Sequence, residues 1–157
     1  MSDFVKIKHV RIKWPNFEGK VSEFNQNGQK GFDVILPEEV ALDLYDSGWN
    51  VRKREINNDG DYEYYINVAV SFDKGNPPII YKIQDGYKQL LSEETACVID
   101  TYHNQGAIED ITVKLRPYPW HKGGRSGIKA YLFRMNIWVT SDDMDEELAG
   151  IPDISMR

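Results

Sequence analysis

The sequence contains a single cysteine, Cys97, and has no hydrophobic run long enough to cross a bilayer. One cysteine excludes an intramolecular disulfide and a zinc site built from several cysteines. Cys97 lies in the apolar stretch Thr95–Ile99, so we interpret it as a small core residue. The N-terminus also lacks the apolar core of a signal peptide. We therefore expect an intracellular protein in a reducing environment, without membrane contact.

Signatures of the common catalytic and nucleotide-binding sites are missing as well. There is no Gly-x-Gly-x-x-Gly, no Gly-Lys-Ser/Thr phosphate loop, no His-Glu-x-x-His and no nucleophile elbow. His9, His103 and His121 are isolated, and Asp100 near His103 is typical of a solvated helix edge. The stretch 57–61 lacks the frame and the closing glutamate of a calcium loop, and Asp-Gly favours a hairpin turn there. The sequence predicts no enzyme activity, no cofactor and no metal site.

Negative charge is concentrated at one end of the chain. The formal net charge is −6, and residues 141–157 hold six acids and one base, which leaves −1 for residues 1–140. We interpret 1–140 as one domain and 141–157 as a disordered acidic tail. The acids proposed to bind a partner are Asp142, Asp143, Asp145, Glu146 and Glu147.

Hydrophobic periodicity predicts a chain made mostly of strands. The expected strands are 4–14, 31–36, 49–56, 62–73, 79–83, 108–116 and 127–139. The apolar residues of 4–14 change parity midway, which indicates a bulge or a strong bend. In the last strand, we expect Tyr131, Phe133, Met135, Ile137 and Val139 to face the core, and Leu132 to face away.

Two short helices are expected between these strands. One opens at Pro37 and stops at Gly48, and the other runs from Ser92 to about Asn104. The order of elements favours a mainly β fold, an OB-fold-like antiparallel Greek-key barrel with one or two short helices. A β-sandwich remains open, because a pattern of strands does not fix their order in space.

Basic and aromatic residues give the clearest functional signal. The stretch 116–129 is basic, aromatic and glycine-bearing, and we predict a loop there. Lys and Arg contact phosphates, while aromatic rings stack on unpaired bases of any sequence. Trp120 is favoured as a ligand contact, and Trp14, Trp49 and Trp138 could be core or surface residues. The candidate DNA-binding residues are Lys13, Trp14, Trp49, Arg52, Arg54, Arg116, Tyr118, Trp120, Lys122, Arg125, Lys129 and Arg134.

Six short blocks follow one another along the chain. They are Gly48–Arg52, Val68–Phe72, Pro77–Tyr81, Leu90–Thr95, Arg116–Trp120 and Lys129–Leu132. Together they resemble a family of small phage-encoded single-stranded-DNA-binding proteins, over most of the chain from about Phe17. The resemblance implies an OB-fold, sequence-tolerant binding of single strands and a place in phage DNA replication or recombination, in the cytoplasm of the infected bacterial host. It also implies that Tyr118, Trp120 and Lys129 bind DNA.

The acidic tail is similar in kind to those of bacterial and phage single-strand binders, which recruit replication proteins and compete with DNA. Its last residues, Gly150–Arg157, depart from the common bacterial ending because they lack a terminal aromatic. Single-stranded DNA is the expected partner, with replication or recombination proteins at the tail, and self-association is left open. An alternative is a structural phage protein that makes protein–protein contacts. A nuclease would need a carboxylate cluster that the spacing does not supply.

Overall fold

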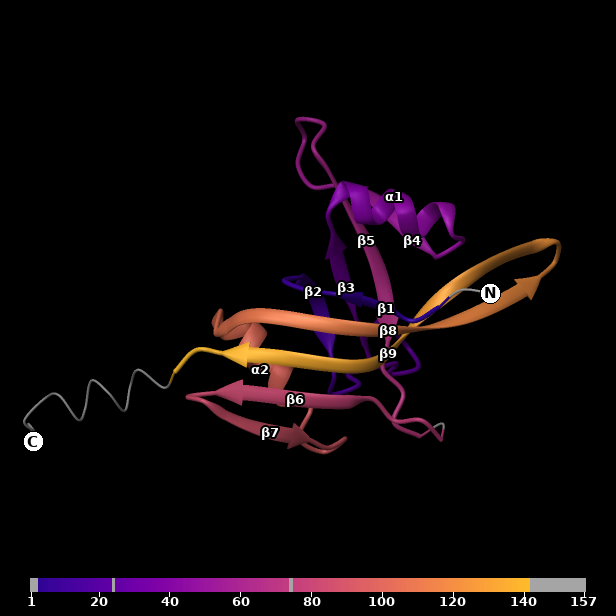
Figure 1. The fold of residues 1–157 in the computed structure, drawn as a ribbon. Coiled ribbons are helices and arrows are strands. Elements are labelled where there is room, and N and C mark those ends of the chain that lie inside the picture. The colour runs from indigo at the N-terminus through magenta and orange to yellow at the C-terminus, as the bar shows by residue number, and fades with distance from the viewer. Residues whose placement is uncertain (1–2, 24, 74, 142–157) are drawn as a thin grey trace, which may run out of the picture.

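The computed structural model describes residues 3–23, 25–73 and 75–141, which form nine strands and two helices (Figure 1). The elements, in chain order, are β1 (Val5–Ile7), β2 (Arg11–Asn16), β3 (Gly31–Leu36), α1 (Glu38–Asp46), β4 (Val51–Glu55), β5 (Tyr62–Ala69), β6 (Ile79–Gln84), β7 (Tyr87–Leu91), α2 (Val98–Gln105), β8 (Ile108–Lys122) and β9 (Arg125–Val139). No helix in this part of the chain is long and apolar enough to span a membrane.

The strands form one sheet that curls into a partly open barrel. Its order is β1-β8-β9-β5-β3-β2, with β4 added at β5 and β6–β7 added at β9. β1 pairs with β8 and β2 pairs with β3, so the two N-terminal strands are the first and the last strand of this order. This is the arrangement of an OB-fold, and it confirms the mainly β prediction. Two pairings, β5–β9 and β6–β9, are parallel within a sheet that we expected to be antiparallel.

The N-terminal segment bends where the sequence predicted a change of parity. His9, between β1 and β2, has a φ of 57°. That left-handed conformation turns the chain so that β1 ends on β8 and β2 begins along β3. Val10 N then donates a hydrogen bond to Ile111 O, which keeps the bend attached to β8.

The core lies inside the barrel, and α2 packs against β2. Phe17 and Phe32 are fully buried and stacked, with ring centroids 5.3 Å apart. His103 Nε2 on α2 donates to Ile12 O, and the Asp100 carboxylate accepts hydrogen bonds from two backbone N–H groups that follow β2. These contacts position the loop between β2 and β3, and this loop forms one wall of a groove.

Several local predictions need correction. β7 was not expected, and α2 begins at Val98 instead of Ser92, because Ser92 and Thr95 form a hydrogen-bonded turn. The predicted loop 116–129 is a two-stranded arm, since β8 reaches Lys122 and β9 starts at Arg125 (Figure 1).

Prolines fit this arm because of how its edges are paired. Pro119 lies opposite Ile128, whose backbone N–H and C=O bond instead to Gly48 O and Asn50 N. The ladder between β8 and β9 therefore requires no backbone N–H from position 119. Proline is tolerated at such positions, where its missing N–H would have faced away from the partner strand.

A bulge in β9 changes which residues face the core. Leu115 pairs with Leu132 and Lys114 pairs with Arg134, so Phe133 is an extra residue. Met135, Ile137 and Val139 are buried as predicted. The predictions for Tyr131 and Phe133 were wrong because both are only partly buried, and Leu132, predicted to face away, is 3% exposed.

Four charged side chains connect β2, β3, β4 and β5 on the outside of the barrel. Glu63 Oε2 accepts hydrogen bonds from Lys13 Nζ and Arg54 Nε, each at 2.8 Å. Arg54 Nη1 also reaches Asp33 Oδ2 at 3.1 Å, and Asn67 Nδ2 donates to Asp33 Oδ1 at 3.0 Å. Glu63 and Asp33 are buried, so these contacts compensate for the loss of hydration.

The ion pairs shift two pKa values. Burial by itself would raise the pKa of Glu63, but hydrogen bonds and charge from Lys13 and Arg54 outweigh burial and lower that pKa. Burial would lower the pKa of Arg54, and its contacts with Glu63 and Asp33 outweigh burial and raise it. Both shifts favour the charged pair over its neutral forms.

We expect Glu63→Gln to reduce the free energy of unfolding at pH 7 by about 2 kcal/mol, because it removes the charge that Lys13 and Arg54 share. A carboxylate with a lowered folded-state pKa stabilises the protein above its unfolded-state pKa, and this contribution disappears as the pH falls through the folded value. The difference between wild type and variant should therefore be full at neutral pH and shrink below about pH 4.3. Urea unfolding at a series of pH values measures it. The exposed Glu55→Gln on the same strand pair is the control, and a difference that persisted at acidic pH would contradict the assignment.

Candidate nucleic-acid interface

One face of the β8–β9 arm gathers aromatic and basic side chains. The pleat places Arg116, Tyr118 and Trp120 of β8 on the same side, opposite Tyr131, Lys129 and Gly127 of β9 in register. The other side holds Pro117 and Pro119 opposite the buried Ala130 and Ile128. The pairing of β8 with β9 therefore supplies core residues on one side and candidate contact residues on the other.

The rings and cations on this outer face already contact one another. Tyr118 and Tyr131 are 5.4 Å apart between ring centroids, and Tyr118 is 50% exposed. Arg116 Cζ lies 5.4 Å and Lys129 Nζ lies 5.8 Å from the Tyr131 centroid. Such packing limits side-chain motion, so less conformational entropy is lost when a ligand binds.

A groove of about 820 Å³ borders this face. Trp14 and the loop between β2 and β3 form one side, while Asn67 of β5 and Lys129 and Tyr131 of β9 form the other. Lys30, Asp73 and Glu93 also line it, and Lys30 Nζ pairs with Glu93 at 3.1 Å. The groove therefore offers aromatic rings and amide groups next to Lys129, which forms no ion pair within the described part of the chain.

Trp14 is exposed because of its backbone conformation. Its φ is 55°, and the register between β2 and β3 shifts between Lys13 and Asn16. The left-handed residue in this irregular stretch directs the indole outward, so 73% of the residue is exposed. A tryptophan held at such a position has a ring face that is accessible for stacking.

A second hollow, of about 470 Å³, lies under the arm. Trp120 and Ser126 line it from the arm, and Tyr45, Asn50 and Arg52 line it from the α1–β4 region. Gly127 makes room for the indole, because a Cβ there would be 3.0 Å from the Trp120 ring and would also meet Asn50 Oδ1. Tyr45 and Asn50 were missed by the sequence analysis. The one sequence signal for this packing is Gly127 within a predicted strand, because a glycine there can mark a close approach of another group to the backbone.

Three of the predicted contact residues are buried or ion-paired within the fold. Trp49 is 3% exposed and belongs to the core, so its ring has no free face and we withdraw it as a stacking residue. Lys13 and Arg54 lie on the outer face, but their charges are neutralised by Glu63 and Asp33. Their cationic side chains stabilise the barrel, and competing phosphates would have to displace these carboxylates.

The remaining predicted cations are spread along β8 and β9. Lys122 and Arg125 are paired at the exposed tip of the arm, beside Gly123 and Gly124, which have positive φ. Arg134 lies past the bulge, opposite Lys114. The predicted tail acids Asp142, Asp143, Asp145, Glu146 and Glu147 lie outside the described residues.

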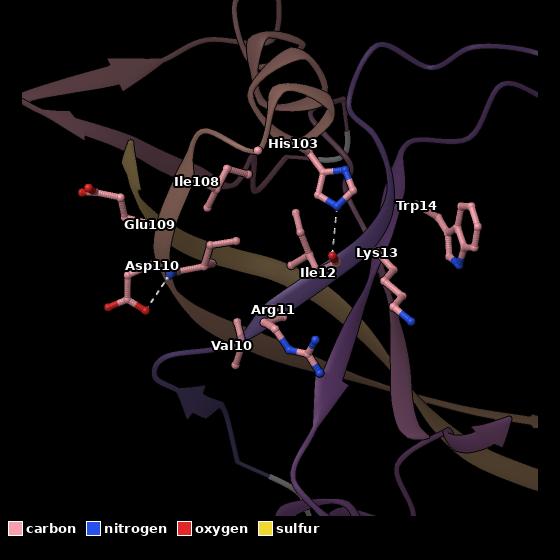
Figure 2. A pocket seen from close by; sticks show the side chains of 11 residues that line it. Val10, Arg11, Ile12, Lys13, Trp14, His103, Ile108, Glu109 and Asp110 are labelled. Atoms are coloured by element: carbon pink, nitrogen blue, oxygen red, sulfur yellow. Dashed lines mark hydrogen bonds between the residues drawn. The ribbon is translucent and has the colours of Figure 1, made fainter. Parts of the chain in front are cut away.

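A third cavity, of about 560 Å³, lies between β2, the end of α2 and the start of β8 (Figure 2). Apolar side chains such as Val10, Ile12 and Ile108 line much of it, and Trp14 projects to its side. Arg11 and Lys13 line it together with Glu109 and Asp110, so its charged lining is mixed. It offers fewer aromatic and amide groups than the groove does. Across the described residues, no group of three His, Cys, Asp or Glu side chains could hold a metal ion.

Comparison with solved structures finds similar folds in phage proteins. The single-stranded DNA-binding protein from bacteriophage Enc34 in complex with ssDNA is 13% identical, covers 85% of each chain and has a TM-score of 0.51. A C-terminal truncation of the Enc34 protein is 12% identical, covers 87% of this chain and 84% of that one, and has a TM-score of 0.52. At these identities, the likeness concerns the fold. No curated protein matches the chain.

The comparison with family models covers nearly the whole chain. Residues 2–157 match the model described as "Putative phage ssDNA-binding domain". This match agrees with the resemblance seen in the sequence blocks and with the OB-type strand order. The chain belongs to this family of phage single-stranded-DNA-binding proteins.

Proposed function

We propose that this chain binds single-stranded DNA without sequence preference during phage DNA replication or recombination, in the cytoplasm of the infected host. The observation that supports this most directly is the outer face of β8 and β9, where Arg116, Tyr118, Lys129 and Tyr131 lie beside the groove that Trp14 borders. Rings would stack on bases, and the cations would contact phosphates. Neither contact requires a bond to break, so the role is non-enzymatic.

The geometry favours a single strand over a duplex. A base in a duplex has both of its faces covered by neighbouring base pairs, whereas an unpaired base can present a face to a ring. Trp14 and Tyr118 are among the most exposed aromatic residues in the described chain, and both lie at or near the groove. Each stacked base is worth about 1–3 kcal/mol, and every base offers such a face.

Local charge matters more than net charge for this interface. Residues 1–140 sum to −1, yet Arg52, Arg116 and Lys129 form no ion pair with any described carboxylate. Phosphates can approach these cations without displacing a carboxylate of the described residues. Binding should release counterions and weaken as the salt concentration rises.

Fluorescence anisotropy with a labelled oligo-dT of about 30 nucleotides, and with the matching duplex, tests the function; that length exceeds the roughly 4–16 nucleotides bound per OB fold. We expect tight binding to the single strand alone, weakened by salt. Failure to bind either probe, with residues 141–157 present and then removed, would contradict the proposal and favour a structural role through protein–protein contacts.

Replacing Trp14 with alanine should weaken single-strand binding by about tenfold or more, because one stacking ring is lost. The melting temperature should change little, since the indole is 73% exposed. Tyr87→Ala is the matched control, because Tyr87 is 79% exposed and lines neither the groove nor the hollow under the arm. Equal affinities for the two variants would exclude Trp14 as a contact.

We further propose that the acidic tail competes with DNA for the basic face and recruits replication or recombination proteins. Its five acids between Asp142 and Glu147 match the charge of a short stretch of phosphates. Removal of residues 141–157 should tighten binding to oligo-dT, most strongly at low salt, where charges are least screened. A full-length chain with these five acids changed to amides should behave like the truncated chain. Unchanged or weaker binding in either form would rule out competition.

A further inference from the structure

A second group of rings and cations lies on the same outer face, beyond the bulge in β9. We name it the distal patch, and it consists of Phe4, Lys6, Tyr81, Lys88, Leu90, Lys114, Phe133 and Arg134. These residues come from the start of the chain and from β1, β6, β7, β8 and β9. Neither the groove nor the hollow under the arm includes any of them.

Cations and rings alternate across the distal patch. Phe4 and Phe133 meet edge to face at 4.8 Å, and Lys114 Nζ lies 5.6 and 5.5 Å from their ring centroids. On the far side, Lys88 Nζ lies 4.2 Å and Arg134 Cζ lies 5.4 Å from the Tyr81 centroid. This is the same combination of groups as on the arm, where Arg116 and Lys129 flank Tyr131.

The charge of the distal patch is not compensated. It holds three lysines and one arginine and no acid. Within the described chain, none of these four cations lies within ion-pair distance of a carboxylate. Lys13, Lys30 and Arg54, in contrast, are all paired. A cluster of unpaired cations with partly exposed rings matches the chemistry of a polyanion that also has flat bases.

The distal patch continues the interface on the arm. The cross-strand pair Arg116–Tyr131 is followed along the same two strands by Lys114–Arg134. The extra residue Phe133 lies between them, and the bulge keeps Lys114 and Arg134 on the outer face. A DNA strand that leaves the groove at Tyr131 therefore reaches Lys114 and Arg134 directly, because these cations follow Tyr131 along the same pair of β-strands.

We propose that single-stranded DNA extends from the groove onto the distal patch, which binds additional nucleotides of the same strand. The inference rests on the proposed function, and it assigns a second DNA-binding subsite formed by β1, β6, β7, β8 and β9. Lys6, Lys88, Lys114 and Arg134 contact phosphates there, and Phe4 and Tyr81 offer surfaces to bases. The occupant is a nucleic-acid strand because the patch combines four unpaired positive charges with aromatic rings.

The test compares a short and a long ligand. The full-length double variant Lys114→Gln/Arg134→Gln is measured by anisotropy against oligo-dT of about 6 and about 30 nucleotides, lengths chosen around the roughly 4–16 nucleotides bound per OB fold. Affinity for the long oligonucleotide should fall by about tenfold near 0.1 M salt, with a salt slope lower by about 1.4 for two lost phosphate contacts. Affinity for the short oligonucleotide, which the groove alone accommodates, should be unchanged.

Three further variants make the result specific. Lys6→Gln/Lys88→Gln, at the two edges of the patch, should reproduce the loss for the long oligonucleotide. Lys53→Gln is the control, because Lys53 is exposed, forms no ion pair within the described chain and lies outside the groove and the patch; it should change neither affinity. Arg116→Gln should weaken binding at both lengths.

The outcomes separate this inference from the proposed function. Equal losses at both lengths, or no loss at either, for both patch variants would overturn the extended site while leaving binding in the groove intact. Wild-type protein that binds neither length would overturn the proposed function itself.

Discussion

The pairing of β8 with β9 is the constraint on which the rest of the structure depends. These two long strands form a wall of the barrel and continue past it as the arm, and the pleat fixes the direction of every side chain along them. Residues such as Val113 and Ile137 fill the core, while their neighbours on the outer face are free for contacts. The bulge at Phe133 adjusts this alternation once, so that both halves of the ladder keep basic residues outside.

The outer face uses its cations in two ways. Where β2, β3, β4 and β5 meet, Lys13 and Arg54 are paired with Glu63 and Asp33, and their charges stabilise the fold. Along β8 and β9 the cations contact rings instead, and Lys114, Arg116, Lys129 and Arg134 form no ion pair with a described carboxylate. This division explains how a domain with almost no net charge can present a positive surface. Binding then depends on where carboxylates are absent from the described face, and not on an excess of bases.

Sequence analysis predicted much of the fold, because strands and helices with regular periodicity are local features. The strand 31–36, the helix after Pro37 and the bend near His9 were found in this way. Pairing between distant segments was not accessible. The stretch 116–129 was interpreted as a loop, and its place in a strand pair becomes clear only from its register with β9 and from the bonds of Ile128 to Gly48 and Asn50. The ion pairs of Arg54 likewise depend on residues from other strands.

The candidate site shows the same limit. Sequence analysis grouped Tyr118, Trp120 and Lys129, which are close along the chain, and the structure places them on one face of a hairpin. Trp14 and Trp49 look alike in sequence, yet one is 73% and the other 3% exposed. At 12–13% identity, the Enc34 structures share a fold with this chain, and a shared fold constrains mainly which positions face inward. Outward positions are free to differ, so the interface has to be argued from the residues present here, their pairing and their exposure.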